Sequence, residues 1–292
     1  MTNARGAWSV ALAAGCELAE RPVWDEHDQS LVWVDILGGS AHRLSSGGGD
    51  SAIAVGAPLG AAGLRHGGGL ILASAGALVF LDAAGRCDRE PIAAALPAGV
   101  RFNDGACDPA GRFLVGTTSL DGQRERGALL AVWPDGHIDV LLEGVTESNG
   151  LCWSPDGGTL YYVDSGEQHI RAYAYDVGTG RLGARRDVVR IDDADGVPDG
   201  LAIDRSGAIW VALWEGSAVR RYAADGRRLA HLPLPVSRPT CPGFGGGELD
   251  RLFVTSAWEG MTPAGRAGER WAGHILVCDP GVSGMPANRF AG

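Results

Sequence analysis

The sequence contains no lysine, so all 25 of its basic residues are arginine. Acidic residues number 35, and the formal net charge at pH 7 is -10. An acidic surface repels phosphate backbones and anionic lipid headgroups. No apolar run approaches the roughly 18 residues that a membrane-spanning helix needs. We therefore expect neither a nucleic acid nor a membrane as a partner.

Several sequence motifs of common enzymes are also missing. There is no GxSxG nucleophile elbow, no HExxH zinc motif and no Walker A loop. The cysteines form no CxxC pair and no tight cluster with histidine, which excludes a zinc knuckle and a dithiol redox motif. They are Cys16, Cys87, Cys107, Cys152, Cys241 and Cys278. Free thiols in a reducing cytoplasm are the simplest interpretation.

Glycine and proline are abundant, at 46 and 15 residues, and they separate short apolar runs. This pattern favours an all-β protein. Six of the runs recur with first residues 39, 43, 47, 49 and 43 positions apart, which is close to the roughly 40–50 residues of a four-stranded propeller blade. They are Leu31–Asp35, Leu70–Ser74, Phe113–Thr117, Leu160–Asp164, Ile209–Leu213 and Leu252–Ser256.

The repeat predicts a single six-bladed β-propeller domain over residues 1–292. Each run follows a polar turn, and most are followed by a second hairpin arm, such as His169–Asp176. Too few residues flank the six runs for a seventh blade, so strands from the two ends of the chain should complete one blade together. The stretch Ala7–Cys16 faintly resembles a lipoprotein signal, but closure requires it as a strand. A β-sandwich or two stacked β-domains are the alternatives, although the turns of a sandwich recur at shorter intervals.

Equivalent positions on the innermost strands should form a ring around the central channel. Counting back 10 to 12 residues from each run gives Glu20, Leu59 or Gly60, Asn103, Asn149, Asp199, and Thr240 or Cys241. Four of the six positions thus carry an acid or an amide. Buried carboxylates are costly without a counter-charge, and oxygen ligands suit a hard divalent cation. Taken singly, Asn103-Asp104-Gly105 and Asp199-Gly200 could equally be ordinary turns.

The same motifs resemble those of the SMP-30/gluconolactonase (regucalcin-like) family over nearly the whole chain. The matching segments are Glu20-Arg21-Pro22-Val23-Trp24, Arg101-Phe102-Asn103-Asp104-Gly105, Ser148-Asn149-Gly150-Leu151 and Pro198-Asp199-Gly200-Leu201. The resemblance implies a six-bladed propeller that binds one divalent metal ion and hydrolyses a sugar lactone. Calcium, magnesium, manganese and zinc all remain open as the metal.

The resemblance also implies roles for individual residues. The metal ligands would be Glu20, Asn149 and Asp199, with Asp199 also the catalytic base. Arg101, Asn103 and Asp121 would bind the substrate. Arg101 lies two residues before Asn103, on the same strand face, although a surface salt bridge is the simpler use of an arginine.

One departure from the family pattern bears on the pocket. Arg21 directly follows Glu20, where related proteins usually have glycine. It should place a large cation near the metal, where it would repel the ion or bind an acidic substrate.

Two other functions stay open at this stage. The chain could be a metal-dependent enzyme acting on a non-sugar lactone, ester or cyclic intermediate, an alternative favoured by Arg21, Trp214 and Trp258. It could also be a propeller without catalytic activity that binds a metal or a protein. For the enzyme, the expected partner is a small-molecule substrate, and the protein a monomer or small homo-oligomer.

Overall fold

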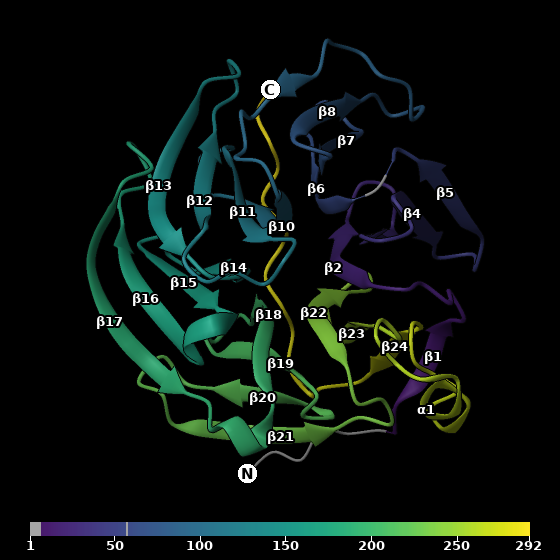
Figure 1. Cartoon of the computed structure of the whole chain (residues 1–292). Helices are drawn as coiled ribbons and strands as arrows, with labels where there is room; N and C mark the ends of the chain where they lie inside the picture. Colours follow the sequence, from purple (N-terminus) through teal and green to yellow (C-terminus); the bar gives the residue numbers. More distant parts are fainter. Residues whose placement is uncertain (1–6, 57) are drawn as a thin grey trace.

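The computed structural model describes residues 7–56 and 58–292 as six four-stranded antiparallel sheets arranged around a central channel (Figure 1). This architecture is the predicted six-bladed β-propeller. Blade 1 holds β2 (Ala19–Asp25), β3 (Ser30–Asp35), β4 (Ser40–Ser45) and β5 (Asp50–Ala54). Blade 2 holds β6 (Leu59–Leu64), β7 (Leu70–Ser74), β8 (Ala77–Leu81) and β9 (Ile92–Ala93). Blade 3 holds β10 (Val100–Cys107), β11 (Phe113–Ser119), β12 (Gly127–Val132) and β13 (Ile138–Val145).

The remaining blades follow the same up-and-down order. Blade 4 holds β14 (Ser148–Trp153), β15 (Thr159–Asp164), β16 (His169–Tyr175) and β17 (Leu182–Arg190). Blade 5 holds β18 (Val197–Ile203), β19 (Ile209–Trp214), β20 (Ala218–Tyr222) and β21 (Arg228–Pro233). Blade 6 holds β22 (Pro239–Gly245), β23 (Arg251–Ser256) and β24 (Ile275–Cys278). A short helix, α1 (Pro263–Gly268), lies between β23 and β24.

Blade 6 is completed by the other end of the chain, as predicted. Strand β1 (Ser9–Leu12) pairs antiparallel with β24, with Ser9 opposite Val277 and Val10 opposite Leu276. The stretch that resembles a signal sequence therefore contains the outermost strand of this blade. The pairing gives β24 a second neighbour and closes the ring.

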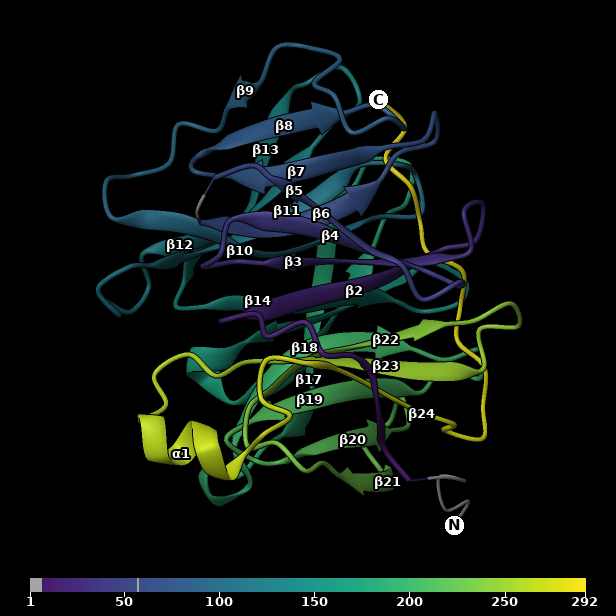
Figure 2. The same cartoon turned by 90° about the vertical axis from the view of Figure 1, so that its right-hand side faces the viewer.

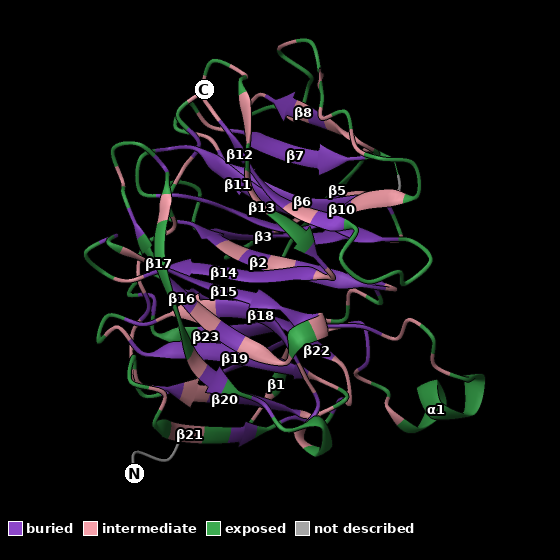
Figure 3. Ribbon diagram, turned by 60° about the vertical axis from the view of Figure 1, so that its left-hand side comes forward, coloured by how far each residue is buried: buried purple, intermediate pink, exposed green. Residues whose placement is uncertain are grey.

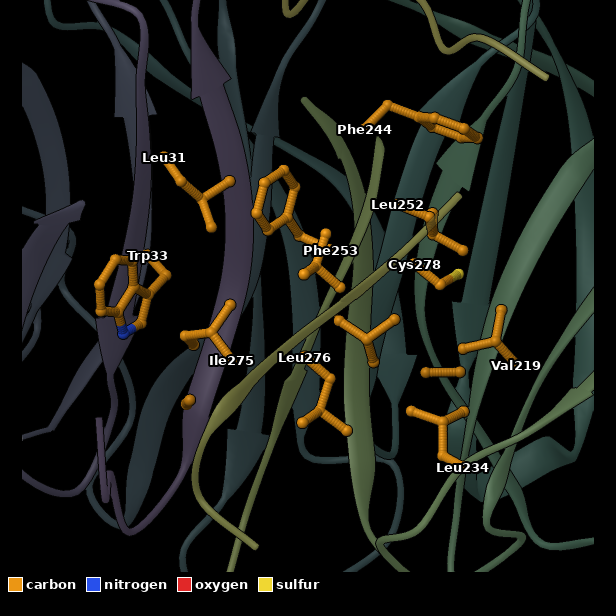
Figure 4. Close-up of a cluster of buried hydrophobic side chains, with 14 of the residues drawn as sticks. Leu31, Trp33, Val219, Leu234, Phe244, Leu252, Phe253, Ile275, Leu276 and Cys278 are labelled. Atoms are coloured by element: carbon orange, nitrogen blue, oxygen red, sulfur yellow. The ribbon is translucent and has the colours of Figure 1, made fainter. Parts of the chain in front are cut away.

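Apolar side chains between neighbouring blades form the core. Burial falls from the inner strands to the outer ones, and β5 is exposed along its whole length (Figure 3). Where blade 6 meets its neighbours, Trp33 of β3, Phe253 of β23 and Ile275 of β24 belong to one buried cluster (Figure 4). The described residues include no helix long and apolar enough to cross a membrane. All six cysteines are free, and only Cys87 is exposed.

The six apolar runs of the sequence lie on the second strand of each blade, so the strand before each run is the innermost one. The register of every innermost strand shifts close to its predicted ring position, for example between Asn149 and Leu151 and between Pro198 and Leu201. Such bulges re-aim a side chain at a strand end. They explain why the ring residues can point into the channel.

The glycines after Asn149 and Asp199 are needed for close packing. Each lies within a strand. Asp199-Gly200 in β18 and Asn103-Asp104-Gly105 in β10 are strand residues, so their interpretation as ordinary turns is wrong. A Cβ atom on Gly150 would lie 2.6 Å from the carbonyl oxygen of Asp199, and one on Gly200 would lie 2.3 Å from Sγ of Cys241. Adjacent inner strands can approach this closely only where one of them has no side chain.

The C-terminal segment, residues 279–292, covers one end of the channel. It runs along the side of the molecule opposite to α1 (Figure 2). Its backbone bonds the first hairpin turns of several blades, including Arg205 N–H to Ser283 O and Ala291 N–H to Gly111 O, both at 2.9 Å. Phe290 is fully buried among blade 2 and blade 3 side chains. The segment therefore ties distant blades together at the end away from the strand starts that carry the predicted ligands.

Candidate metal centre

A cavity of about 270 Å³ lies at the end of the channel where the innermost strands begin. The predicted ring residues Glu20, Asn103, Asn149 and Asp199 all line it. They come from blades 1, 3, 4 and 5 and are between 4% and 7% exposed. The structure thus brings the three predicted metal ligands to one small space.

The cavity wall also follows a simple positional rule. The residues two positions before the ring line it, namely Leu18, Arg101, Glu147 and Val197. So do residues where the second strands end, namely Ile36, Ser165 and Trp214. Glu259, three residues after β23 ends, lines it as well. Arg101 was recognised by this spacing, but Glu147 was missed although it stands in the same relation to Asn149. Glu259 was missed because it lies in the long connection between β23 and β24, which the repeat does not predict.

The two ring carboxylates lack a cationic partner. Among the described residues neither Glu20 nor Asp199 forms an ion pair, and Glu20 accepts one hydrogen bond, from the Arg21 backbone N–H at 2.7 Å. Burial raises the pKa of Glu20 well above its usual value, and nearby Asp104 adds to the effect. Burial also raises the pKa of Asp199, and the charges of Glu20 and Glu147 raise it further. A divalent cation bound between these two buried carboxylates would balance their charge and favour their ionised forms.

The donor chemistry fits a hard cation. Within the part of the chain that the structure describes, no three His, Cys, Asp or Glu side chains gather closely enough to hold a metal by themselves. Here two carboxylates combine with the amides of Asn103 and Asn149, and no thiol or imidazole lines the cavity. Carboxylate and amide oxygens are the ligands that calcium, magnesium and manganese prefer.

Hydrogen bonds orient the amides and the predicted substrate arginine. Arg101 Nη1 donates to Asn103 Oδ1 at 2.7 Å and to the Phe102 carbonyl at 2.9 Å. Asn103 Nδ2 donates to Asn149 Oδ1 at 3.0 Å. Burial raises the pKa of Glu147, while Arg101 opposes the rise. Among the described residues, Arg101 is the one arginine that lines this cavity, and two further carboxylates, Glu147 and Glu259, line it as well.

Three candidate residues lie outside this cavity, namely Asp121, Trp258 and Arg21. Asp121 follows β11 in a turn, where its carboxylate accepts hydrogen bonds from Ser119 and Gln123, and it does not line the cavity. Of the two tryptophans singled out in the sequence, Trp214 lines the cavity and Trp258 does not.

Arg21 points away from the predicted ligands. Its side chain lines a second cavity of about 290 Å³, which the C-terminal segment covers. Its guanidinium donates to the Leu151 carbonyl at 3.3 Å and lies 3.7 Å from Asp104 Oδ2. The expectation that Arg21 contacts substrate in the metal cavity is therefore corrected, because the bulge turns successive side chains toward different cavities.

Comparison with known proteins identifies the family of the chain. Residues 18–258 match the SMP-30/Gluconolactonase/LRE-like region. The chain belongs to this family. It is 34% identical to human regucalcin over 295 residues, covering 96% of this chain and 97% of that protein.

Solved structures of the family superpose closely. A calcium-binding regucalcin from Agrobacterium tumefaciens aligns with a TM-score of 0.92 at 28% identity, covering 97% of each chain. A luciferin-regenerating enzyme aligns with a TM-score of 0.89 at 25% identity, covering 98% of this chain and 99% of that one. Family membership and fold are therefore settled together.

Proposed function

We propose that the protein is a metal-dependent lactonase that opens a neutral sugar lactone to its hydroxy acid. The observation that carries this proposal is the cluster of Glu20, Asn149 and Asp199 at one cavity, an amide and two buried carboxylates that form no ion pair within the described residues. The family includes gluconolactonases by name, and the similar Agrobacterium protein is described as calcium-binding. A divalent cation held there would polarise the lactone carbonyl and stabilise the negative charge that develops on its oxygen.

The side chains of the cavity divide the remaining work. Asp199 orients a water molecule and takes its proton as the water oxygen attacks the carbonyl carbon. Burial raises the pKa of this carboxyl, and a cation held beside it would oppose that rise and keep it ionised, so that it can accept the proton. The acyl–oxygen bond of the ring then breaks, and the ring oxygen takes up a proton and leaves as a hydroxyl group. Arg101 and Asn103 hold the ring hydroxyls, since the guanidinium has donors beyond those that bind Asn103 and Phe102.

The charges of the cavity favour a neutral substrate. Of the residues that the structure describes, four carboxylates line it, Glu20, Glu147, Asp199 and Glu259, and one arginine, Arg101. A divalent cation would balance two of the four and Arg101 a third. A lactone that carries a phosphate or a second carboxylate would therefore meet net negative charge.

A second candidate keeps the metal centre and changes the substrate to a non-sugar lactone, ester or cyclic intermediate. Trp214 in the cavity wall favours it, because an indole can pack against an apolar ring. The similarity to a luciferin-regenerating enzyme points the same way.

One substrate panel separates the two candidates. Metal-loaded protein would be assayed on neutral aldonolactones, on alkyl and aryl lactones, and on aryl esters. The first proposal expects kcat/KM to be highest for an aldonolactone and to depend on added metal. A clear preference for an apolar lactone or ester would replace it with the second candidate.

A further inference from the structure

The hydroxyl of Ser165 connects two of the strands that carry the proposed ligands. Ser165 follows β15, is buried, and lines the cavity of about 270 Å³. Its Oγ accepts a hydrogen bond from Asn149 Nδ2 at 2.8 Å and donates one to the Pro198 carbonyl at 2.7 Å. One side chain therefore bonds the blade 4 ligand and the residue directly before the blade 5 ligand, Asp199.

The ends of this hydrogen-bond chain decide which way the Asn149 amide faces. A carbonyl only accepts, so Ser165 gives its one proton to Pro198 and must accept from Asn149. The Asn149 group against Ser165 is then its NH₂, and Oδ1 lies on the other side. At the far end a guanidinium only donates, so Arg101 fixes Asn103 Oδ1 toward itself and leaves Asn103 Nδ2 for Asn149 Oδ1.

The backbone around Ser165 is also held in place. The Asp164 carboxylate accepts from the N–H groups of Thr146, Glu147 and Gly166 at 2.9, 3.0 and 3.1 Å. The turn that begins at Ser165 is thereby tied to the residues that lead into β14. The position of the hydroxyl relative to Asn149 is therefore set by the blade.

We propose that Ser165 is a positioning residue that keeps the amide oxygen of Asn149, rather than its nitrogen, available to a cation beside Glu20 and Asp199. The inference rests on the proposed metal centre. Without the hydroxyl, the Asn149 NH₂ group loses its acceptor, and the amide keeps only the hydrogen bond from Asn103 to hold its orientation. A rotated amide would turn its N–H hydrogens toward the cation, and these groups cannot coordinate a cation.

Metal affinity measured apart from turnover tests the proposal. Calcium and manganese would each be titrated calorimetrically into chelator-treated wild type, Ser165→Ala and Ser165→Thr. The matched control is Ser74→Ala, which also removes a buried hydroxyl that donates to a carbonyl, that of Gly56 at 2.9 Å, but away from the cavity. We expect Ser165→Ala to weaken binding about 10-fold or more, in the range for partners of metal ligands. Ser165→Thr and Ser74→Ala should stay close to wild type.

Repeating Ser165→Ala in a protein that already carries Asn149→Asp separates an effect on the orientation of the Asn149 amide from general damage to the fold. In an Asn149→Asp protein the two side-chain oxygens are equivalent, so rotation no longer matters. There Ser165→Ala should lose much less affinity than it does with Asn149 present. An equal loss in both backgrounds, or wild-type affinity in Ser165→Ala itself, would overturn the proposal.

These outcomes are independent of lactone turnover. If Ser165→Ala binds metal weakly and no lactone is cleaved by wild type, the positioning role stands and the lactonase proposal fails. If wild type is a metal-dependent lactonase and Ser165→Ala binds metal normally, the positioning role fails alone.

Discussion

Glu20 of β2 and Asp199 of β18 face one cavity from different blades, and the charge of Glu20 adds to burial in raising the pKa of Asp199. In the metal-free protein both carboxyls therefore favour the protonated form more than they do in the unfolded chain. Such a group stabilises the fold below its unfolded pKa, and the stabilisation is lost as the pH rises through the folded pKa. The proposed ligands should thus destabilise the metal-free protein at neutral pH.

Removing either charge should stabilise the metal-free protein. At pH 7.5, Glu20→Gln and Asp199→Asn should each raise the free energy of unfolding by about 1 kcal/mol or more, roughly 2–4 °C in Tm. The advantage over wild type should shrink as the pH is lowered toward 5. Burial lowers the pKa of His231 and His274, which acts in the opposite direction, so each variant is compared with wild type at the same pH. A gain that is absent at pH 7.5, or constant from pH 5 to 8, would contradict this electrostatic account.

The acidic wall should control the choice between neutral and anionic lactones. Replacing Glu147 and Glu259 together by glutamine should raise the ratio of kcat/KM for an anionic lactone to that for a neutral one by about 10-fold. The gain should fall as salt is added, because screening weakens the repulsion that the wild type exerts. Steady-state assays with paired substrates measure the ratio. An unchanged ratio of kcat/KM values in the double variant would show that Glu147 and Glu259 do not contact the substrate.

Phe290 should contribute strongly to stability although it lies in an irregular segment near the C-terminus. The side chain is fully buried, with its ring centroid 6.0 Å from that of Phe80. Phe290→Ala should cost about 3 kcal/mol or more, roughly 6–12 °C in Tm. The control is Val140→Ala on β13, where the side chain is 55% exposed and little should change. Equal Tm shifts in the two variants would mean that the segment does not fasten the blades.

Asp121 should matter less to catalysis than Arg101. Its carboxylate is exposed and already bonded by Ser119 and Gln123, whereas Arg101 lines the cavity. We expect Asp121→Asn to change kcat/KM by less than about 3-fold and Arg101→Met to lower it by about 100-fold or more, as for loss of a charged contact. A comparable loss in both variants would support the substrate-binding role predicted for Asp121 from the family resemblance.

The sequence predicted the propeller because its signal is periodic. Runs such as Leu160–Asp164 mark one strand per blade, so counting residues was enough to find the innermost strands and the ring that includes Asn149. Closure by β1 followed from the residues left over. The same counting could have found Glu147, which precedes Asn149 as Arg101 precedes Asn103.

What the sequence could not give depends on side-chain direction and on irregular segments. Arg21 directly follows the proposed ligand Glu20 in the chain but faces another cavity, because the bulge after Glu20 changes the side on which successive residues project. Glu259 lies in the long connection after β23, to which the repeat assigns no position. Ser165 is one of many serines until the hydrogen bonds to Asn149 and Pro198 are known.

The most direct test of the account compares metal binding with lactone turnover in one preparation. Chelator-treated protein would be titrated with calcium or manganese while heat of binding and hydrolysis of a neutral aldonolactone are both followed. We expect activity to be absent without metal and to reach its maximum at one ion per chain. Glu20→Gln and Asp199→Asn should lose both signals, with kcat lowered at least about 100-fold in Asp199→Asn. Full turnover in the presence of chelator, or in either variant, would contradict a metal-dependent lactonase built on these residues.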